Sequence, residues 1–178
     1  MMTVETARLV GAPVTRGDLE ELRSLFQDDQ VARTMAGKRT DAEVGAIVER
    51  DVEHWQRHDY GMWAWRCSES GVFVARGGLR TVPLLGRVET EVGYAVMPRS
   101  WCQGFATEIA TFSVGYAVAQ AGLDALVSMT LPTNEGSRRV MAKAGFTYDR
   151  DIVHWDLPHV LYRLTPGEPT RPLGSAGG

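Results

Sequence analysis

Two apolar segments joined by a short turn are the feature that most restricts the fold of this chain. Residues 62–66 and 72–79 flank Ser68-Glu69-Ser70-Gly71, whose small and polar residues are typical of a hairpin turn. So short a connection joins antiparallel strands. Because helical segments are interspersed with the strands, we expect an α/β (α+β) fold with a mixed, largely antiparallel central sheet of about six to seven strands, flanked by about four helices.

The spacing of apolar residues and the turn signals place the remaining elements. Thr40 and Glu43 have the spacing of a capping box, and an apolar stripe at helical spacing follows them. Gly145-Phe146 has the form of a glycine helix stop with its apolar partner. We expect strands at 8–10, 88–97, 125–131 and 160–164, a turn at 11–13, and helices at 15–26, 40–59, 105–120 and 134–144.

The length of 178 residues suits one domain, which we place at residues 1–165. The segment 166–178 is rich in Pro, Gly and Ser and is predicted to be a disordered tail. Cys67 and Cys102 are too few and too far apart for a disulfide framework or a Cys-x-x-Cys metal site. We expect both to be reduced thiols.

Charge and hydropathy argue against two classes of partner. The net charge of −3 provides no basic excess, so we expect no nucleic acid partner. No apolar run approaches the roughly 20 residues that span a bilayer, so we expect no membrane partner. The N-terminal residues lack the basic and apolar regions of a signal peptide, which predicts a cytoplasmic protein.

The strand expected at 88–97 has two different faces, because strand side chains alternate. One face is apolar and is predicted to be core, and the other carries charge. The apolar face holds Val92, Tyr94 and Val96, and the polar face holds Glu89, Glu91 and Gly93.

The turn after this strand is predicted to bind an anion. Gly104 and Ala106 leave the first turn of the helix at 105–120 without bulk. Backbone N–H groups there have no intrahelical partner, and the helix dipole is positive at that end. Small side chains let phosphate oxygens approach these groups, and Thr107 adds a hydroxyl. The same residues also fit an ordinary strand-to-helix turn.

Three segments in a fixed order carry a resemblance to a known family. Glu91-Val92-Gly93-Tyr94 precedes Trp101-Cys102-Gln103-Gly104-Phe105-Ala106-Thr107-Glu108, and Asn134-x-x-Ser137-x-x-x-x-x-Lys143-x-Gly145-Phe146 follows after an intervening strand. From about Arg8 to Leu164 the chain resembles the GNAT superfamily of N-acetyltransferases, and within it the branch that includes the ribosomal-protein N-terminal acetyltransferases. The resemblance implies the GNAT fold and acetyl-CoA as cofactor.

The resemblance also implies where acetyl-CoA binds. Two neighbouring strands splay apart, and backbone groups of Val96 and Met97 bond the pantetheine arm like an added strand. Asn134 orients this arm, although it could simply cap a helix. Trp101 stands where the wider superfamily often has Gln or Arg, which argues against a direct phosphate contact by its side chain. The loop that holds the pyrophosphate consists of Gln103, Gly104, Phe105, Ala106 and Thr107.

Acetyl transfer requires a proton path from the amine and help for the departing thiolate. Glu91 is the first candidate for a base, acting directly or through water, and Glu89 is the second; both could instead be solvated carboxylates. Many members of the superfamily place a proton-donating Tyr at the position of Met141, and a thioether cannot donate a proton. The resemblance implies that Ser137 serves the departing thiolate instead. Ser137 could also be simply a small residue that is tolerated near the start of a helix.

Other polar and aromatic residues have plainer interpretations. Cys102 has no evident base near it in sequence, so we interpret it as incidental. His54 and His58 have i, i+4 spacing without a third ligand, which favours a solvated helix face over a metal site. Four aromatic residues form either an acceptor wall or, more commonly, core: Trp55, Tyr60, Trp63 and Trp65.

The sequence therefore predicts an acyltransferase that moves the acetyl group of acetyl-CoA to a primary amine by direct attack. The acceptor is an amine-bearing small molecule or a protein or peptide N-terminus, and the enzyme is a monomer or homodimer. The alternative, which Met141 keeps open, is a non-catalytic acyl-CoA-binding or sensing module of the same fold. A dinucleotide-binding domain needs a Gly-x-Gly-x-x-Gly turn, which the chain lacks.

Overall fold

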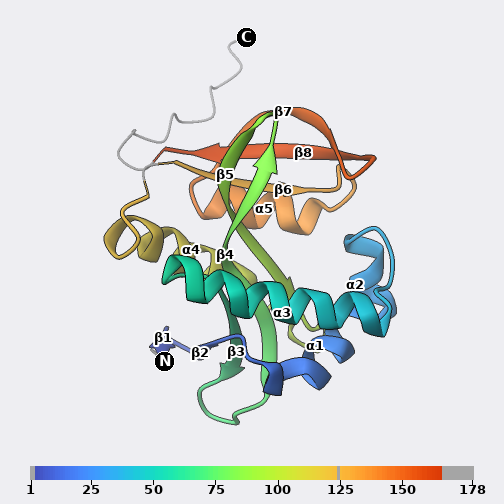
Figure 1. The fold of residues 1–178 in the computed structure, drawn as a ribbon, viewed down its shortest axis with the longest axis vertical. Helices are drawn as coiled ribbons and strands as arrows, with labels where there is room; N and C mark the ends of the chain where they lie inside the picture. The colour runs from blue at the N-terminus through green and yellow to red at the C-terminus, as the bar shows by residue number, and fades with distance from the viewer. Residues whose placement is uncertain (1–2, 124, 166–178) are drawn as a thin grey trace.

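The computed structural model describes residues 3–123 and 125–165; the predicted tail at 166–178 lies outside these ranges. One sheet has the strand order β1-β2-β3-β4-β5-β6-β8-β7 (Figure 1), and its neighbours pair antiparallel except β5 with β6. The strands are β1 Val4–Glu5, β2 Leu9–Pro13, β3 Met62–Cys67, β4 Phe73–Leu84, β5 Arg87–Val96, β6 Leu126–Thr130, β7 Thr147–His154 and β8 Leu157–Leu164. The α-helices are α1 Leu19–Phe26, α2 Asp29–Thr34, α3 Asp41–His58, α4 Phe105–Ala119 and α5 Glu135–Lys143.

The mixed, largely antiparallel sheet is confirmed, but the described residues hold more elements than expected, with eight strands and five α-helices. Strand β7 was not expected because its turn to β8 carries no usual signal. Trp155 and Asp156 have φ of 50° and 60° there, a conformation that Gly and Asn adopt most readily. The turn expected at 11–13 is wrong: β2 continues to Pro13, which pairs with Trp63 of β3.

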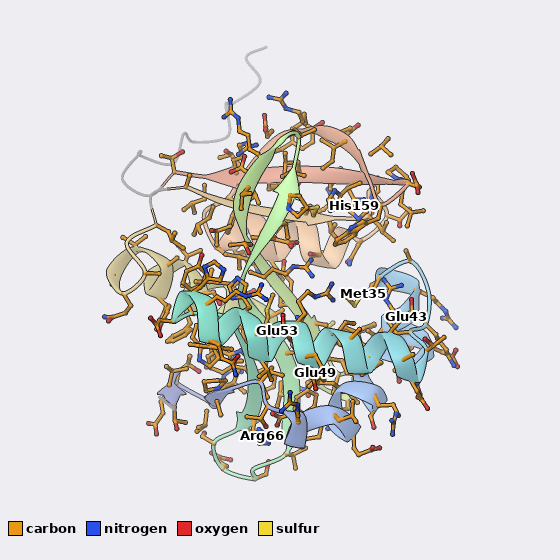
Figure 2. The ribbon with its side chains drawn as sticks, viewed as in Figure 1. Met35, Glu43, Glu49, Glu53, Arg66 and His159 are labelled. Atoms are coloured by element: carbon orange, nitrogen blue, oxygen red, sulfur yellow. The ribbon has the colours of Figure 1, made fainter. Side chains whose placement is uncertain are left out.

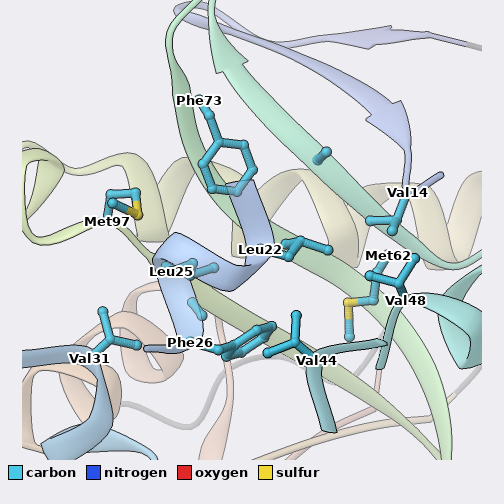
Figure 3. Close-up of a cluster of buried hydrophobic side chains, with 12 residues drawn as sticks. Val14, Leu22, Leu25, Phe26, Val31, Val44, Val48, Met62, Phe73 and Met97 are labelled. Carbon is cyan, nitrogen blue, oxygen red and sulfur yellow. The ribbon is translucent and has the colours of Figure 1, made fainter. Parts of the chain in front are cut away.

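Alternation along β3 divides the core between two faces of the sheet. Met62 and Ala64 face a cluster that includes Leu22 of α1 and Val44 of α3 (Figure 3). Trp63 and Trp65 face the opposite way and pack with Ile109 and other residues of α4. The capping box predicted at the start of α3 is present and fixes where that helix begins.

A second apolar cluster packs α4 and α5 on the other half of the sheet, with Leu79, Val92 and Leu126 fully buried in it. The two halves meet along β4 and β5, the longest pair of strands in the sheet. Across residues 3–123 and 125–165, no helix combines the length and the apolar character that crossing a membrane requires.

Candidate active site

A cavity of about 1160 Å³ lies between the two halves of the sheet. Its walls come from β4, β5 and β6, from the first turn of α4, from α5, from α2 and α3, and from β8 with the β7–β8 turn. In Figure 2, His159 marks the β8 wall, and Met35 and Glu43 mark the wall formed by the end of α2 and by α3. The three motifs that the sequence analysis identified therefore meet at one cavity.

The cavity exists because β5 and β6 separate. These parallel strands share one register pair, Glu91 with Val127. Beyond it β5 continues to Val96, bonded to β4 along its other edge. The Met97 N–H donates to the Val74 carbonyl of β4 at 2.9 Å, so the Val96 backbone groups, one residue earlier, point to the open edge. An open strand edge can bond an extended ligand as an added strand.

Of the two residues expected to bond a pantetheine arm, Val96 lines the cavity and Met97 does not. The Val96 carbonyl accepts a hydrogen bond from the Trp101 indole N–H at 2.7 Å, so Trp101 fixes the end of the strand. Both Met97 backbone groups bond within the protein, because its carbonyl also accepts from the Ser100 N–H at 2.8 Å. Among the described residues, the backbone group left free at this edge is therefore the Val96 N–H.

Helix α4 begins at a glycine in the left-handed region. Gly104 is the N-cap with φ of 84°, and it has no side chain to occupy the first-turn N–H groups. Arg8 holds this loop in place: its guanidinium donates to the Gln103 carbonyl at 2.8 Å and pairs with Glu108 at 2.6 Å. This role of Arg8 was not expected, since nothing in the spacing of the sequence links residue 8 to residue 103.

The loop residues predicted to hold a pyrophosphate separate into two groups. The Gln103 side chain turns away from the cavity and donates to the Arg99 carbonyl at 2.9 Å. The start of α4 thus offers backbone N–H groups and one hydroxyl to an anion. The residues that line the cavity here are Gly104, Phe105, Ala106 and Thr107.

Three polar residues meet at the start of α5. Asn134 is the N-cap, and its Oδ1 accepts the Ser137 N–H at 3.1 Å. The Tyr94 hydroxyl lies 3.0 Å from the Ser137 Oγ and 3.1 Å from the Ser137 carbonyl oxygen. All three residues line the cavity. The structure therefore joins Ser137 to Tyr94, which the sequence analysis had placed on the core face of its strand.

The Tyr94 hydroxyl keeps its proton at neutral pH. Burial raises the pKa of Tyr94 well above its ordinary value, and the charge of Glu91 raises it further, while the hydrogen bond with Ser137 opposes the shift. Met141 is fully buried in the core and does not line the cavity. Residue 141 therefore offers no proton donor to the cavity, whereas the hydroxyl-bearing Tyr94 and Ser137 both line it.

Glu91 and Arg80 lie opposite each other on β5 and β4 and form an ion pair, with Nε 2.6 Å from Oε2. Glu91 is 3% exposed, and the guanidinium compensates for burying its charge. It lines the cavity, and its Oε1 has no hydrogen-bond partner among the described residues. Glu89 does not line the cavity and pairs with Arg163 at 3.0 Å. The geometry therefore favours Glu91 over Glu89.

The tryptophans divide between core and cavity. Trp63 and Trp65 are fully buried and pack edge-on against Phe112 of α4, which confirms the core interpretation for them. Trp155, at the tip of the β7–β8 turn, does line the cavity, and its ring lies 5.6 Å from the Arg80 guanidinium carbon. Trp155 was not expected at the cavity, because strand β7 and its turn to β8 were not expected.

Of the two histidines expected on a solvated helix face, His58 is exposed and His54 is not. His159 is buried and lines the cavity, and its Nδ1 donates to the Leu157 carbonyl oxygen at 3.0 Å. His54 is not a solvated surface residue: its Nδ1 donates to the Tyr60 carbonyl at 2.8 Å, and its Nε2 accepts the Thr81 N–H at 3.0 Å. It fastens α3 to β4.

The cavity offers free backbone groups and basic side chains that suit acetyl-CoA. The open edge at Val96 suits the amides of a pantetheine arm, and the start of α4 suits a pyrophosphate. Gly104 has φ of 84°, a conformation that residues with a side chain rarely adopt, so the position next to the first-turn N–H groups favours a residue without a Cβ. Arg139 and Lys143 of α5 add positive charge to the same wall.

Comparison with known proteins agrees with this geometry. Residues 8–147 match the family described as the acetyltransferase (GNAT) domain. The FsC-acetyl coenzyme A-N(2)-transacetylase of Aspergillus fumigatus is 32% identical over 156 residues, which cover 82% of this chain and 65% of that protein.

Solved structures share the fold. The acetyltransferase from Agrobacterium tumefaciens str. C58 has a TM-score of 0.82 at 22% identity and covers 92% of this chain and 94% of its own. RimL, a ribosomal L7/L12 α-N-protein acetyltransferase in complex with coenzyme A, has a TM-score of 0.75 at 11% identity, with 92% of this chain and 98% of its own covered.

Proposed function

The chain belongs to the GNAT acetyltransferase family, and on that premise we propose that it is an N-acetyltransferase of the branch that includes the ribosomal-protein N-terminal acetyltransferases. It takes the acetyl group of acetyl-CoA and transfers it to the primary amine of a small molecule or of a protein or peptide N-terminus. The observation that carries the proposal is the Tyr94–Ser137 pair, a proton donor beside the open edge of β5.

The residues that would hold acetyl-CoA are the Val96 backbone, the first-turn N–H groups of α4 from Gly104 to Thr107, and Asn134. When bound there, it supplies a thioester whose C–S bond is exchanged for the C–N bond of an amide, while the amine loses a proton and the departing thiolate gains one. Thr107 adds a hydroxyl to the phosphate end. Gln103 and Met97 contribute through loop and strand geometry, since their side chains do not line the cavity.

Glu91 receives the amine. Its negative charge attracts an ammonium group, and its free Oε1 accepts a proton from the amine directly or through a water molecule. Arg80 holds Oε2, which fixes the orientation of the carboxylate. The neutral amine that results is the nucleophile that acetyl transfer requires.

Ser137 supports the leaving group. Ser137 lines the cavity, and its hydroxyl can donate to a thiolate. The Tyr94 hydroxyl, which donates to the Ser137 carbonyl and lies 3.0 Å from the Ser137 Oγ, can then turn its proton to that Oγ. Asn134 fixes the Ser137 backbone through its cap hydrogen bond. This arrangement supports turnover rather than cofactor binding alone, because a sensing module needs no donor at that point.

Calorimetry with acetyl-CoA, followed by a thiol-release assay on a panel of amines, tests the proposal. We expect binding and amine-dependent release of coenzyme A. Binding without release for any amine would favour the non-catalytic acyl-CoA-binding module. Absence of binding would rule out both functions.

A further inference from the structure

The cavity carries a charge opposite to that of the whole chain. The net charge of the sequence is −3, whereas the cavity is lined by seven basic and three acidic side chains. Two of the basic residues, Arg139 and Lys143, belong to α5 at the cofactor end. The other five come from α2, α3, β4 and the residues between them: Arg33, Arg39, Arg50, Arg76 and Arg80.

Only part of this second group is neutralised by nearby carboxylates. Arg76 is buried and forms a bidentate pair with Asp51, with both bonds at 2.6 Å. Arg80 uses its Nε for Glu91, and its two terminal nitrogens have no partner among the described residues. Glu43, the remaining acidic residue on this wall, is held by the backbone and hydroxyl of Thr40 in the helix cap.

Arg50 and Arg33 are the two members of this group for which the described residues provide no hydrogen bond or ion pair, and of the two Arg50 belongs to the same helix, α3, as the buried Asp51. The Arg50 side chain lines the cavity from this helix. Partial burial and the charges of Arg80 and Arg76 lower the pKa of Arg50, which shows that like charges crowd this position. A bound anion would relieve that repulsion.

The position of these groups relative to Glu91 limits what the anion can be. Arg80 pairs with Glu91, and both line the same cavity as Arg50. The charge of Arg80 is close enough to Arg50 to lower the pKa of Arg50. The cavity therefore places an acidic group for the amine next to two guanidinium groups with free donors. A molecule that carries both an amine and a carboxylate matches this arrangement, with its amine at Glu91 and its carboxylate at the guanidinium groups.

We propose that the acceptor is a small amine that also bears a carboxylate, such as an amino acid, and that Arg50 with the free terminal nitrogens of Arg80 binds the carboxylate. The inference rests on the proposed function and specifies its acceptor. Guanidinium groups pair with carboxylates through parallel hydrogen bonds, which gives orientation as well as attraction. Because the arginines line the cavity itself, the carboxylate enters it together with the amine.

The test compares α- and γ-amino acids with their own carboxamides as acceptors, in the wild-type protein and in Arg50→Met. The ratio of kcat/KM for the acid to kcat/KM for the amide is measured for each protein, so that differences in amine basicity cancel between them. We expect the ratio to fall about tenfold or more in Arg50→Met, as the loss of a charge-assisted hydrogen bond implies. Arg57→Met is the matched control, since Arg57 lies on the same helix and pairs with Glu53 outside the cavity.

The outcomes separate the inference from the function on which it rests. Acetylation of acids and amides with the same ratio in both proteins would overturn the carboxylate site and leave the acetyltransferase standing. Acetylation of acidic peptide N-termini but of no free amino acid would overturn the small-molecule class. If no amine is acetylated and acetyl-CoA does not bind, both the carboxylate site and the proposed acetyltransferase function would be overturned. Thermal unfolding of Arg50→Met checks that the variant is folded.

Discussion

The Tyr94 hydroxyl lies 3.0 Å from the Ser137 Oγ, and the two residues come from a strand and a helix 43 positions apart in the chain. The pair connects the open edge of β5 to the start of α5, on either side of the same cavity. In the proposed reaction, the neutral Tyr94 phenol can return a proton to Ser137 after the serine hydroxyl has donated its own.

Removal of this donor should reduce turnover more than cofactor affinity. We expect Ser137→Ala to lower kcat about a hundredfold, in the range of general acid catalysis, with the Kd for acetyl-CoA little changed. Tyr94→Phe should lower kcat about tenfold, because Ser137 remains but loses its hydrogen-bond partner. Stopped-flow thiol release and calorimetry measure the two quantities. Equal turnover in Ser137→Ala would remove the residue from the mechanism.

A negative charge at the start of α4 should prevent acetyl-CoA binding. Gly104 is a poor place to introduce it, because any side chain at φ of 84° strains the backbone. Ala106 has ordinary helical surroundings and lines the cavity, so Ala106→Glu should weaken binding by about a hundredfold or more through repulsion of the pyrophosphate.

The control for Ala106→Glu is Val118→Glu on the same helix, because Val118 is 44% exposed and does not line the cavity. It should bind acetyl-CoA like the wild-type protein. Undiminished binding by a folded Ala106→Glu variant would show that the pyrophosphate does not lie at the start of α4.

Removal of the Glu91 charge should lower kcat/KM for the amine acceptor. Glu91→Gln keeps the shape of the side chain but cannot attract an ammonium or accept its proton, and we expect kcat/KM for the amine to fall about a hundredfold. Glu89→Gln, on the same strand but outside the cavity, should leave it near the wild-type value. If the two variants behaved alike across a pH profile, Glu91 would have no special role as a base.

How far the sequence predicts this site depends on the range of the interactions. Signals between residues close in the chain predict the structure correctly. The capping box at Thr40 begins α3, and the small residues from Gly104 onward begin α4, as the spacing predicts. The roles of Arg8 and Tyr94 depend on partners about 95 and 43 positions away, Gln103 and Ser137, and no periodicity records such distances.

The end of the cavity that we propose for the acceptor is the part that the sequence predicts least. It depends on Trp155 and His159, which reach the cavity through the β7–β8 hairpin, whose turn residues are unusual for such a turn. It also depends on arginines spread over α2, α3 and β4, which face one cavity only after folding. Periodicity identifies buried faces but cannot show which faces meet.

The Arg76–Asp51 pair should be a major determinant of stability. Both side chains are almost fully buried and form two hydrogen bonds of 2.6 Å. Asp51→Asn leaves a buried guanidinium without its counter-charge, so we expect a loss of about 3–5 kcal/mol in the free energy of unfolding. Glu53→Gln, which removes an exposed pair on the same helix, should cost less than about 0.5 kcal/mol. Urea denaturation measures the free energy of unfolding of both variants. Similar losses would contradict the conclusion that the buried Arg76–Asp51 pair is a major determinant of stability.

Stability should also depend on pH through His54. Burial lowers the pKa of His54 below 6.5, and the positive charge of nearby His58 lowers it further, while its hydrogen bond to the Tyr60 carbonyl opposes the shift. Above pH 6.5 the ring is neutral in both the folded and the unfolded states. Below it the unfolded state binds more protons, so stability falls as the pH decreases from 7 toward 5.

The His54→Gln variant isolates that contribution. Its free energy of unfolding should change less between pH 7 and pH 5 than that of the wild-type protein, since the side chain no longer titrates. An equal change in both proteins would mean that His54 does not contribute to the pH dependence.

Transfer of a labelled acetyl group tests the proposed function most directly. The protein is incubated with acetyl-CoA labelled in its acetyl carbons and with a panel of primary amines, and the products are identified by mass spectrometry. We predict a labelled N-acetyl amide formed in a one-to-one ratio with free coenzyme A thiol. Saturable binding of acetyl-CoA with no labelled amide from any amine would contradict the account and identify the chain as a binding module.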